Sequence, residues 1–540
     1  MRMMESGMVK RGILAAAICM ASMAHAQGSE VPHIATHDGR HALIVDGAPF
    51  LMLGAQVNNS SNYPAALPAV WPMLDRLHAN TVEVPVAWQQ IEPQEGRFDF
   101  SFVQTLLDGA RAHGKRVVML WFGAYKNTAP GYVPDWVKTD NRRFPRMKTR
   151  DGKDHYVLSP NARTTLEADK RAFVTLMTYL RDHDPQNTVV LVQVENETGS
   201  YQSPRDFGPA AQKLFDGPVP APLHKRGTWA EAYGAQADRA FNTWYTARYC
   251  NELAAAGKAV KPLPMYVNAS LADPFKVPAP TAVASGGPQQ DVLAIWKAAA
   301  LAIDFEAPDI YDRDPAHVAA YLDAYRRPDN ALAVPEIGNA RDYARFFWAA
   351  IGRGAIGFSP FGMDATGYVN YPLGAKVLDE ATVDAFASKY ALFAPMVRPW
   401  ARLAFGHPVW GTAKGADGAP QSTTMGGWTI TASYGEWQFG HRTDTWIKSE
   451  PPAWADQPVG GAVAMQIAPD QYLVSGDHVR LDFKPGQGAP AGSMILRVEE
   501  GRLTDAGFVA ERVWNGDETD YGLNFVDKPV LLRVTVGRYR

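Results

Sequence analysis

Eight short apolar segments recur between residues 31 and 362, and most of them are separated by amphipathic stretches of helix length. Alternation of this kind is typical of parallel strands joined by helices. The repeat count predicts a (β/α)8 barrel with insertions, whereas a doubly wound sheet, the alternative, would need fewer repeats. The segments are Phe50–Gln56, Thr81–Pro85, Arg116–Phe122, Val189–Glu195, Leu263–Asn268, Ala302–Tyr311, Ala331–Glu336 and Ala355–Phe361.

The pattern changes after Tyr368. Residues 31–375 are assigned to the barrel and residues 376–403 to a helical connection. Residues 404–540 contain short alternating runs divided by Gly, Pro and Asp, which predict an antiparallel β-sandwich. Such a domain either packs on the barrel or binds sugar as an independent module, and packing is the commoner role.

The first 26 residues have the features of a secretory signal peptide. Arg2, Lys10 and Arg11 precede a short apolar run, and a small-x-small cleavage signal ends at Ala26. We therefore expect an exported protein, periplasmic or secreted, with no membrane anchor after cleavage, since no later stretch is apolar enough to span a bilayer. Cleavage leaves Cys250 as the single cysteine and moves the net charge from −3 to −5. This mild acidity argues against nucleic acid as a partner.

Polar and aromatic residues gather just after the predicted strands, where a barrel carries its active site. Taken singly, each is more often a loop residue than a ligand, but seven strand ends share the property. Amides, ammonium groups and flat rings at one rim are typical of a sugar site. The candidate substrate-binding residues are Gln56, Trp88, Lys126, Asn127, Asn196 and Tyr311. The insertion at residues 200–258 is expected to shape the mouth of this site.

Two carboxylates follow strands four and seven, in the segments VQVENE and AVPEIGN. A pair of carboxyl groups about 5–5.5 Å apart is what retaining hydrolysis of a glycosidic bond requires. We assign Glu336 as the nucleophile and Glu197 as the acid/base. Asn196, beside Glu197, is suited to hydrogen-bond the sugar 2-hydroxyl. The bland alternative is that one Glu only caps the following loop.

Other kinds of site are not indicated. Gly352-Arg-Gly-Ala-Ile-Gly357 matches a dinucleotide-binding motif but follows a helix and precedes a strand, the reverse of the required order, so a tight turn is expected. The sequence has no paired Cys spacing, no H-E-x-x-H motif and no nucleophile elbow. No metal and no cofactor are therefore expected.

The segment VQVENETGSY strongly resembles the acid/base motif of glycoside hydrolase family 35, the β-galactosidases. The segment NTVEVPVAWQQIEPQEGRFDF, Asn80 to Phe100, is similar to the second-strand motif of that family, and IVDGAPFLMLGAQVN is similar to its first strand. The resemblance covers most of the barrel. It implies a retaining (β/α)8 enzyme whose donor and nucleophile follow strands four and seven, in agreement with Glu197 and Glu336.

One family feature is missing. Where animal and plant members carry a Cys-Ala-Glu-Trp-like turn, this chain has Ala124-Tyr-Lys-Asn127, so the galactose-binding Glu has no counterpart and Lys126 or Asn127 takes its place. This turn resembles a bacterial branch associated with plant cell walls. The resemblance implies an exo-β-galactosidase acting on xyloglucan or a related oligosaccharide. The alternatives are another retaining β-glycosidase of the clan (β-glucosidase, β-mannosidase or endoglucanase) and a non-catalytic carbohydrate-binding barrel.

Overall fold

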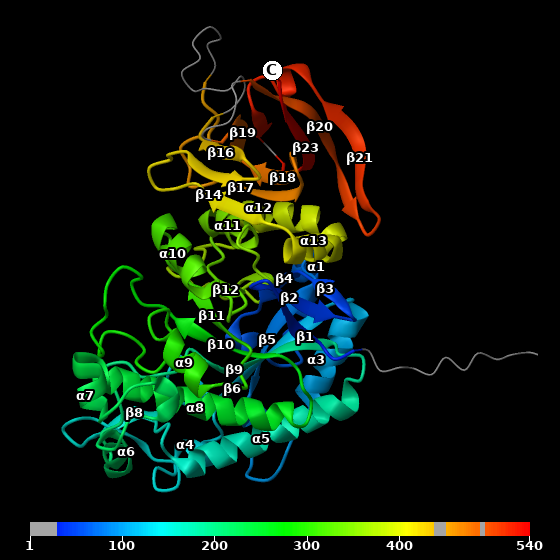
Figure 1. Cartoon of the computed structure of the whole chain (residues 1–540). Helices are drawn as coiled ribbons and strands as arrows, with labels where there is room; N and C mark the ends of the chain where they lie inside the picture. Colours follow the sequence, from blue (N-terminus) through cyan, green and yellow to red (C-terminus); the bar gives the residue numbers. More distant parts are fainter. Residues whose placement is uncertain (1–29, 437–449, 487–491, 527, 540) are drawn as a thin grey trace, which may run out of the picture.

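The computed structural model describes residues 30–436, 450–486, 492–526 and 528–539, and its centre is a closed barrel of eight parallel strands (Figure 1). Each strand coincides with one of the eight predicted segments, which confirms the (β/α)8 prediction. Six of the eight are buried along their whole length, because the barrel core covers one face and helices cover the other. The strands are β4 (Met52–Gln56), β5 (Thr81–Ala87), β6 (Arg116–Lys126), β9 (Val189–Asn196), β10 (Met265–Ser270), β11 (Phe305–Ile310), β12 (Val334–Ile337) and β13 (Gly357–Pro360).

Amphipathic helices surround the barrel. In α3, for example, residues 102, 103, 106, 107 and 110 are buried, the spacing of one apolar helix face. Residues 229–256 have the pattern of one helix in the sequence but contribute to two, α7 and α8, because Gly234 adopts a positive φ of 53° that ends α7. The helices are α1 (Leu67–Arg76), α2 (Trp88–Ile91), α3 (Ser101–Ala112), α4 (Asp135–Lys138), α5 (Arg163–His183), α6 (Pro209–Phe215), α7 (Trp229–Tyr233), α8 (Ala237–Lys258), α9 (Leu293–Ala299), α10 (Pro315–Tyr325) and α11 (Phe346–Ile351).

A small antiparallel sheet closes the end of the barrel where its strands begin. It consists of β1 (His33–His37), β2 (Arg40–Val45) and β3 (Ala48–Phe50). Leu43 and Val45 share one apolar cluster with early strand residues such as Val118 and Phe305. The opposite end of the barrel, where the strands finish, stays available for a site. A hairpin of β7 (Arg146–Lys148) and β8 (Asp154–Leu158) lies in the connection after β6.

Helices α12 (Glu380–Phe393) and α13 (Val397–Gly406) lead to the C-terminal domain, whose two antiparallel sheets confirm the predicted β-domain. Its own apolar cluster includes Trp428, Ile430 and Leu481. The larger sheet contains β14 (Val409–Ala413), β17 (Gly461–Ala468), β18 (Gln471–Asp477), β20 (Ser493–Thr504), β21 (Gly507–Trp514) and β23 (Leu531–Arg538), and the smaller contains β15 (Gln421–Met425), β16 (Trp428–Tyr434), β19 (Val479–Pro485) and β22 (Leu523–Phe525).

The C-terminal domain packs directly on the barrel through α11 and α12. Asp477 is 6% exposed and accepts hydrogen bonds from the Trp348 indole at 2.5 Å and the Lys389 ammonium at 2.8 Å. Burial alone would raise the pKa of Asp477, but the adjacent Lys389 charge overcomes this and lowers it. Gly352, after α11, lies so close to Gly411 of β14 that an added Cβ would be 2.1 Å from the Gly411 backbone. The sandwich is therefore seated tightly on the barrel.

The predicted signal peptide, with Cys19, lies outside the described residues. Within the described ranges, none of the helices is both long and apolar enough to cross a bilayer. Cys250 is fully buried in α8, as a core residue would be.

Candidate active site

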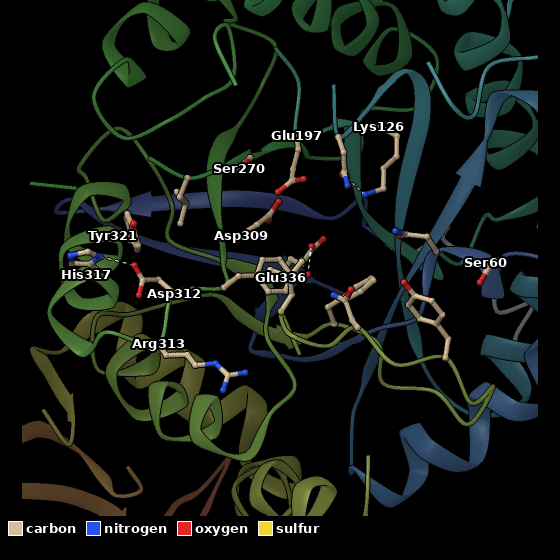
Figure 2. Close-up of a pocket in the computed structure, with 18 of the residues that line it drawn as sticks. Ser60, Lys126, Glu197, Ser270, Asp309, Asp312, Arg313, His317, Tyr321 and Glu336 are labelled. Atoms are coloured by element: carbon tan, nitrogen blue, oxygen red, sulfur yellow. Dashed lines mark hydrogen bonds and ion pairs between the residues drawn. The ribbon is translucent and has the colours of Figure 1, made fainter. Parts of the chain in front are cut away.

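A cavity of about 1050 Å³ opens at the end of the barrel where the strands finish (Figure 2). Its wall is built from the segments that follow β4, β6, β9, β10, β11, β12 and β13. This is the face on which barrel enzymes carry their catalytic groups. The lining residues are Asn59, Ser60, Lys126, Asn127, Tyr132, Glu197, Ser270, Leu271, Asp273, Asp309, Tyr311, Asp312, Arg313, His317, Tyr321, Glu336, Phe361, Tyr368, Asn370 and Leu373.

Glu336 lies in β12 and is held from two sides. The Tyr311 hydroxyl donates to Glu336 Oε1 at 2.5 Å, and the Gln56 amide donates to Oε2 at 3.0 Å. Only 6% of Glu336 is exposed, so these two donors take the place of water around its carboxylate. They fix the direction of the group and stabilise its ionised form, which is the form a nucleophile needs.

Glu197 follows β9 directly and enters the cavity from the opposite strand ends. Its φ is 43°, in the left-handed region, and its backbone is tied down at both ends. The Glu197 N–H donates to Asn268 Oδ1 at 3.0 Å, and its carbonyl accepts from the Thr128 N–H at 3.1 Å. Burial, followed by the negative charge of Glu336, raises the pKa of Glu197 to about 7, against smaller lowering effects of Lys126 and Asp309. Glu197 is therefore half protonated near neutral pH.

Asp309, near the end of β11, is a third carboxyl group in the cavity. It is 3% exposed and accepts a hydrogen bond from Asn268 Nδ2 at 2.7 Å. Burial and the charges of Glu336 and Glu197 hold its pKa well above the ordinary range. In Figure 2 the carboxyl groups of Glu197, Asp309 and Glu336 converge on one region. Asp309 is not among the site residues predicted from the sequence.

Glu195, two residues before Glu197, faces away from the cavity. Its carboxyl group pairs with Asp169 of α5 and accepts from the Tyr125 N–H at 2.8 Å. Asp169 in turn accepts from the Trp121 indole at 2.9 Å and the Tyr249 hydroxyl at 2.8 Å. Burial, and then the neighbouring Asp169, raises the pKa of Glu195 well above its usual value. This buried cluster links the ends of β6 and β9 on the side away from the cavity.

Three of the six predicted substrate-binding residues line the cavity: Lys126, Asn127 and Tyr311. The Lys126 ammonium donates to Asn127 Oδ1 at 2.5 Å, and the Asn127 N–H donates to the Asn196 carbonyl at 3.2 Å. The Asn196 side chain is fully buried and has no hydrogen-bond partner among the described residues. Asn196 is not part of the cavity lining.

Trp88 and Gln56 require correction. Trp88 is fully buried, donates its indole N–H to Glu92 at 2.9 Å and does not line the cavity. It opens α2, which turns its ring into the core instead of under a ligand. Gln56 is 2% exposed and also lies outside the lining, and its amide is occupied by Glu336. Its position is that of a support for Glu336 and not of a sugar ligand.

The insertion after β9 is also placed differently from the prediction. Of the cavity-lining residues, none comes from residues 200–258. Its last helix, α8, packs against α5, and within the insertion Arg205 is held by Asp238 at 2.6 Å. The mouth is shaped instead by Ser270, Leu271 and Asp273 after β10, by the start of α10, and by residues 368–373 after β13. Four prolines between residues 273 and 290, starting at the end of the first of these segments, mark an irregular stretch in the sequence.

The described residues contain no cluster of three or more His, Cys, Asp or Glu side chains arranged to hold a metal ion.

Comparisons with known proteins follow the same division of the chain. Residues 69–260 match the glycoside hydrolase family 42 model, described as Beta-galactosidase. Residues 386–526 match a domain of unknown function, DUF5597. The β-galactosidase-type character of the first region is therefore supported, whereas membership of family 35 stays a prediction.

Two curated relatives are β-galactosidases. The chain is 30% identical over 167 residues to Beta-galactosidase of Xanthomonas manihotis, covering 29% of this chain and 25% of that protein. It is 25% identical over 175 residues to Beta-galactosidase 11 of Arabidopsis thaliana, covering 31% of this chain and 19% of that protein. The matched segments thus span a quarter or less of the relatives' lengths.

A solved structure shares the fold. The crystal structure of the β-galactosidase from the psychrophilic Marinomonas ef1 aligns with a TM-score of 0.50 at 12% identity, over 66% of this chain and 62% of that chain. At this level of identity the likeness concerns architecture alone. The conclusion of the comparisons is that this chain carries a barrel similar to those of β-galactosidases, with part of it matching a β-galactosidase family model.

Proposed function

We propose that the protein is a retaining exo-β-galactosidase. The observation that carries the proposal is that Glu197 and Glu336, from strand ends four and seven of the barrel, line one cavity and influence each other electrostatically. Similarity of residues 69–260 to a β-galactosidase model supports the choice of sugar. A binding barrel without catalysis has no need for this carboxyl pair.

In the proposed mechanism, the Glu336 carboxylate attacks the anomeric carbon while Glu197 protonates the leaving oxygen, which gives a glycosyl-enzyme and a free aglycone. Esterification removes the negative charge of Glu336. Since that charge raises the pKa of Glu197, its loss lowers the pKa of Glu197 and favours the carboxylate. Glu197 then takes a proton from water as the water attacks the intermediate. The same pair therefore acts first as acid and then as base.

The proposed galactose contacts come from the β6 and β9 ends. Lys126 and Asn127 line the cavity beside Glu197 and offer an ammonium and an amide to ring hydroxyls. Asn196 has a buried amide that lacks a partner within the described ranges, and a small side-chain rotation toward the cavity would let it meet the 2-hydroxyl. These contacts suit a polar ring more than an apolar ligand.

The cavity is large for a single sugar ring, which supports an oligosaccharide substrate such as a galactosylated xyloglucan fragment. At about 1050 Å³ it lies at the top of the range for small-molecule sites. Figure 2 shows Tyr321, His317 and Asp312 together on the side of Glu336 away from Lys126. We assign this second arm to the aglycone, with Tyr321 offering an aromatic face to the next sugar.

The experiment is a panel of nitrophenyl glycosides assayed with the full chain and with Glu336→Ala, Glu197→Ala and Glu306→Gln variants. We expect a preference for β-galactoside, loss of turnover in Glu336→Ala, and a loss in Glu197→Ala that is largest for poor leaving groups. Glu306, a buried β11 carboxyl paired with Lys297 at 2.7 Å outside the cavity, is the matched control. Preference for another glycoside, or full activity of Glu336→Ala, would refute the proposal.

The finer parts of the proposal have their own readouts. Proton NMR of the first product should show the β-anomer of galactose, as retention requires. Digestion of a galactosylated xyloglucan oligosaccharide should release galactose and leave the backbone intact. Release of larger fragments would indicate endo action, and release of the α-anomer would contradict the double-displacement mechanism.

A further inference from the structure

Asp309 is a buried carboxyl group of the cavity to which neither the sequence motifs nor the comparisons give a role. We infer that Asp309 is a positioning residue that stays protonated and donates its proton in a hydrogen bond to the Glu197 carboxylate. The inference rests on the proposed function of Glu197 and adds to it the residue that holds the acid/base in place.

The orientation of the Asn268 amide is fixed by its two neighbours, Glu197 and Asp309. The backbone N–H of Glu197 can only donate, and it donates to Asn268 Oδ1 at 3.0 Å. The Asn268 NH2 group therefore faces the other way, where it donates to Asp309 Oδ2 at 2.7 Å. Asn268 thus fixes the position of the Glu197 main chain relative to one carboxyl oxygen of Asp309.

The second carboxyl oxygen of Asp309, Oδ1, has different surroundings from Oδ2. Asp309 Oδ1 is buried, and no side chain or backbone donor reaches it in the described part of the chain. The Asp309 carboxyl group instead lies beside that of Glu197: each of the two groups affects the pKa of the other, and the two converge in Figure 2. Two carboxylates in contact repel each other, so the contact is attractive only when one of them carries the proton. Since Oδ2 already accepts from Asn268, the proton belongs on Oδ1.

The surroundings decide which of the two carboxyl groups keeps that proton. Asp309 is opposite Glu336 in the β11–β12 register, and burial together with the charges of Glu336 and Glu197 makes its ionised form unfavourable. For Glu197 the opposing charge is that of Glu336, while Lys126 favours the ionised form of both Glu197 and Asp309. Hydrogen bonding from Asp309 also lowers the pKa of Glu197. Asp309 therefore helps to keep the pKa of Glu197 at about 7, while the Asp309 carboxyl group itself stays protonated.

The test compares Asp309→Asn with Asp309→Ala in pH profiles of kcat/KM on an aryl β-galactoside with a poor leaving group. An asparagine can still accept from Asn268 and donate to Glu197, so we expect its alkaline limb to stay within about 0.3 pH units of the wild type. Alanine removes the donor, so the limb should move up by about one pH unit and kcat should fall roughly tenfold. Glu306→Gln is the control in the same strand and should leave the limb unchanged.

Two results would overturn the inference. If Asp309 is ionised, both variants remove a negative charge beside Glu197, and both limbs move down. If the residue only fills space, neither variant moves the limb although the thermal stability falls. Circular dichroism of Asp309→Ala checks that it folds, and the asparagine variant is the safeguard if it does not.

A readout without catalysis separates this inference from the proposed function. Infrared difference spectra of the wild type against Asp309→Asn at about pH 7 should contain a protonated-carboxyl band that belongs to Asp309. Absence of the band sinks the inference even if the enzyme is an active β-galactosidase. Presence of the band, together with a wild type inactive on every glycoside, would keep the proton on Asp309 and sink only the proposed function.

Discussion

Above neutral pH, kcat/KM of this protein should fall about tenfold for each further pH unit, because the acid/base Glu197 loses its proton. The pKa of Glu197 is about 7, set first by burial and then by the charge of Glu336. The protonated fraction is therefore one half at pH 7, about a tenth at pH 8 and about a hundredth at pH 9. Since protonation of the leaving oxygen requires that form, kcat/KM should fall in the same proportion.

The assay is the pH dependence of kcat/KM between about pH 5 and 9, with one aryl β-galactoside of poor and one of activated leaving group. The limb should be steep for the first and shallow for the second, since an activated aryl group needs little protonation. Glu197→Gln is neutral at every pH and should lose both the limb and roughly 10²–10⁴-fold in rate on the poor substrate. A limb near pH 7 that persists in Glu197→Gln would refute the reasoning, because another group would then be titrating.

Four further predictions test other parts of the structure. Glu336→Ala should lower kcat by on the order of 10⁴-fold or more, since it removes the attacking carboxylate. Added azide should restore turnover, and an unchanged rate would contradict the assignment. Tyr311→Phe removes the hydroxyl that donates to Glu336 at 2.5 Å. Because a hydrogen bond to a charged group is lost, kcat in the same assay should fall roughly ten- to a hundredfold. An unaltered kcat would count against this role of Tyr311. Glu83 is buried beneath the site, and burial raises its pKa from 4.5 to about 8. It stays protonated in the folded state at pH values where the unfolded state ionises. The free energy of unfolding should therefore fall as the pH rises from about 4.5 to about 8. Glu83→Gln should remove the contribution of Glu83 to that slope and stabilise the fold by at most about 3 kcal/mol at pH 7 in urea unfolding. An identical slope in both proteins would contradict the prediction. Gly352→Ala should lower the free energy of unfolding by at least about 2 kcal/mol in thermal unfolding, because the added Cβ would collide with the β14 backbone. Gly131→Ala is the control and should be neutral, since an added Cβ there meets no atom within 4 Å. Equal effects of the two substitutions would contradict the close approach of Gly352 to β14.

The barrel was predictable because its strands are buried on both faces and so appear in the sequence as uninterrupted apolar runs. Glu336 was predictable for the same reason, as a carboxylate at the end of such a run. Trp88 was misjudged because sequence spacing cannot tell whether a residue after a strand turns toward the mouth or into the core. Only the start of α2 at Trp88 determines that.

Two other features needed the structure for different reasons. Asp309 is two residues before Tyr311, and side chains two apart share one face of a strand, so the inward direction of Tyr311 was a signal that could have found it. Around Glu197 this alternation fails, because Glu195 and Glu197 both have a left-handed backbone, with φ of 63° and 43°. Which glutamate faces the cavity could then be decided by the family motif but not by strand period.

The crowding of carboxyl groups around the cavity links the charge of a ligand to the number of protons on the protein. Glu83, Glu197 and Asp309 all have raised pKa values and retain protons that water would remove. A sugar analogue with a basic ring nitrogen would enter as a cation and favour ionisation of these groups. Its uptake should expel a proton to the buffer, so the binding enthalpy would depend on which buffer accepts it. A neutral galactose would bind without that exchange.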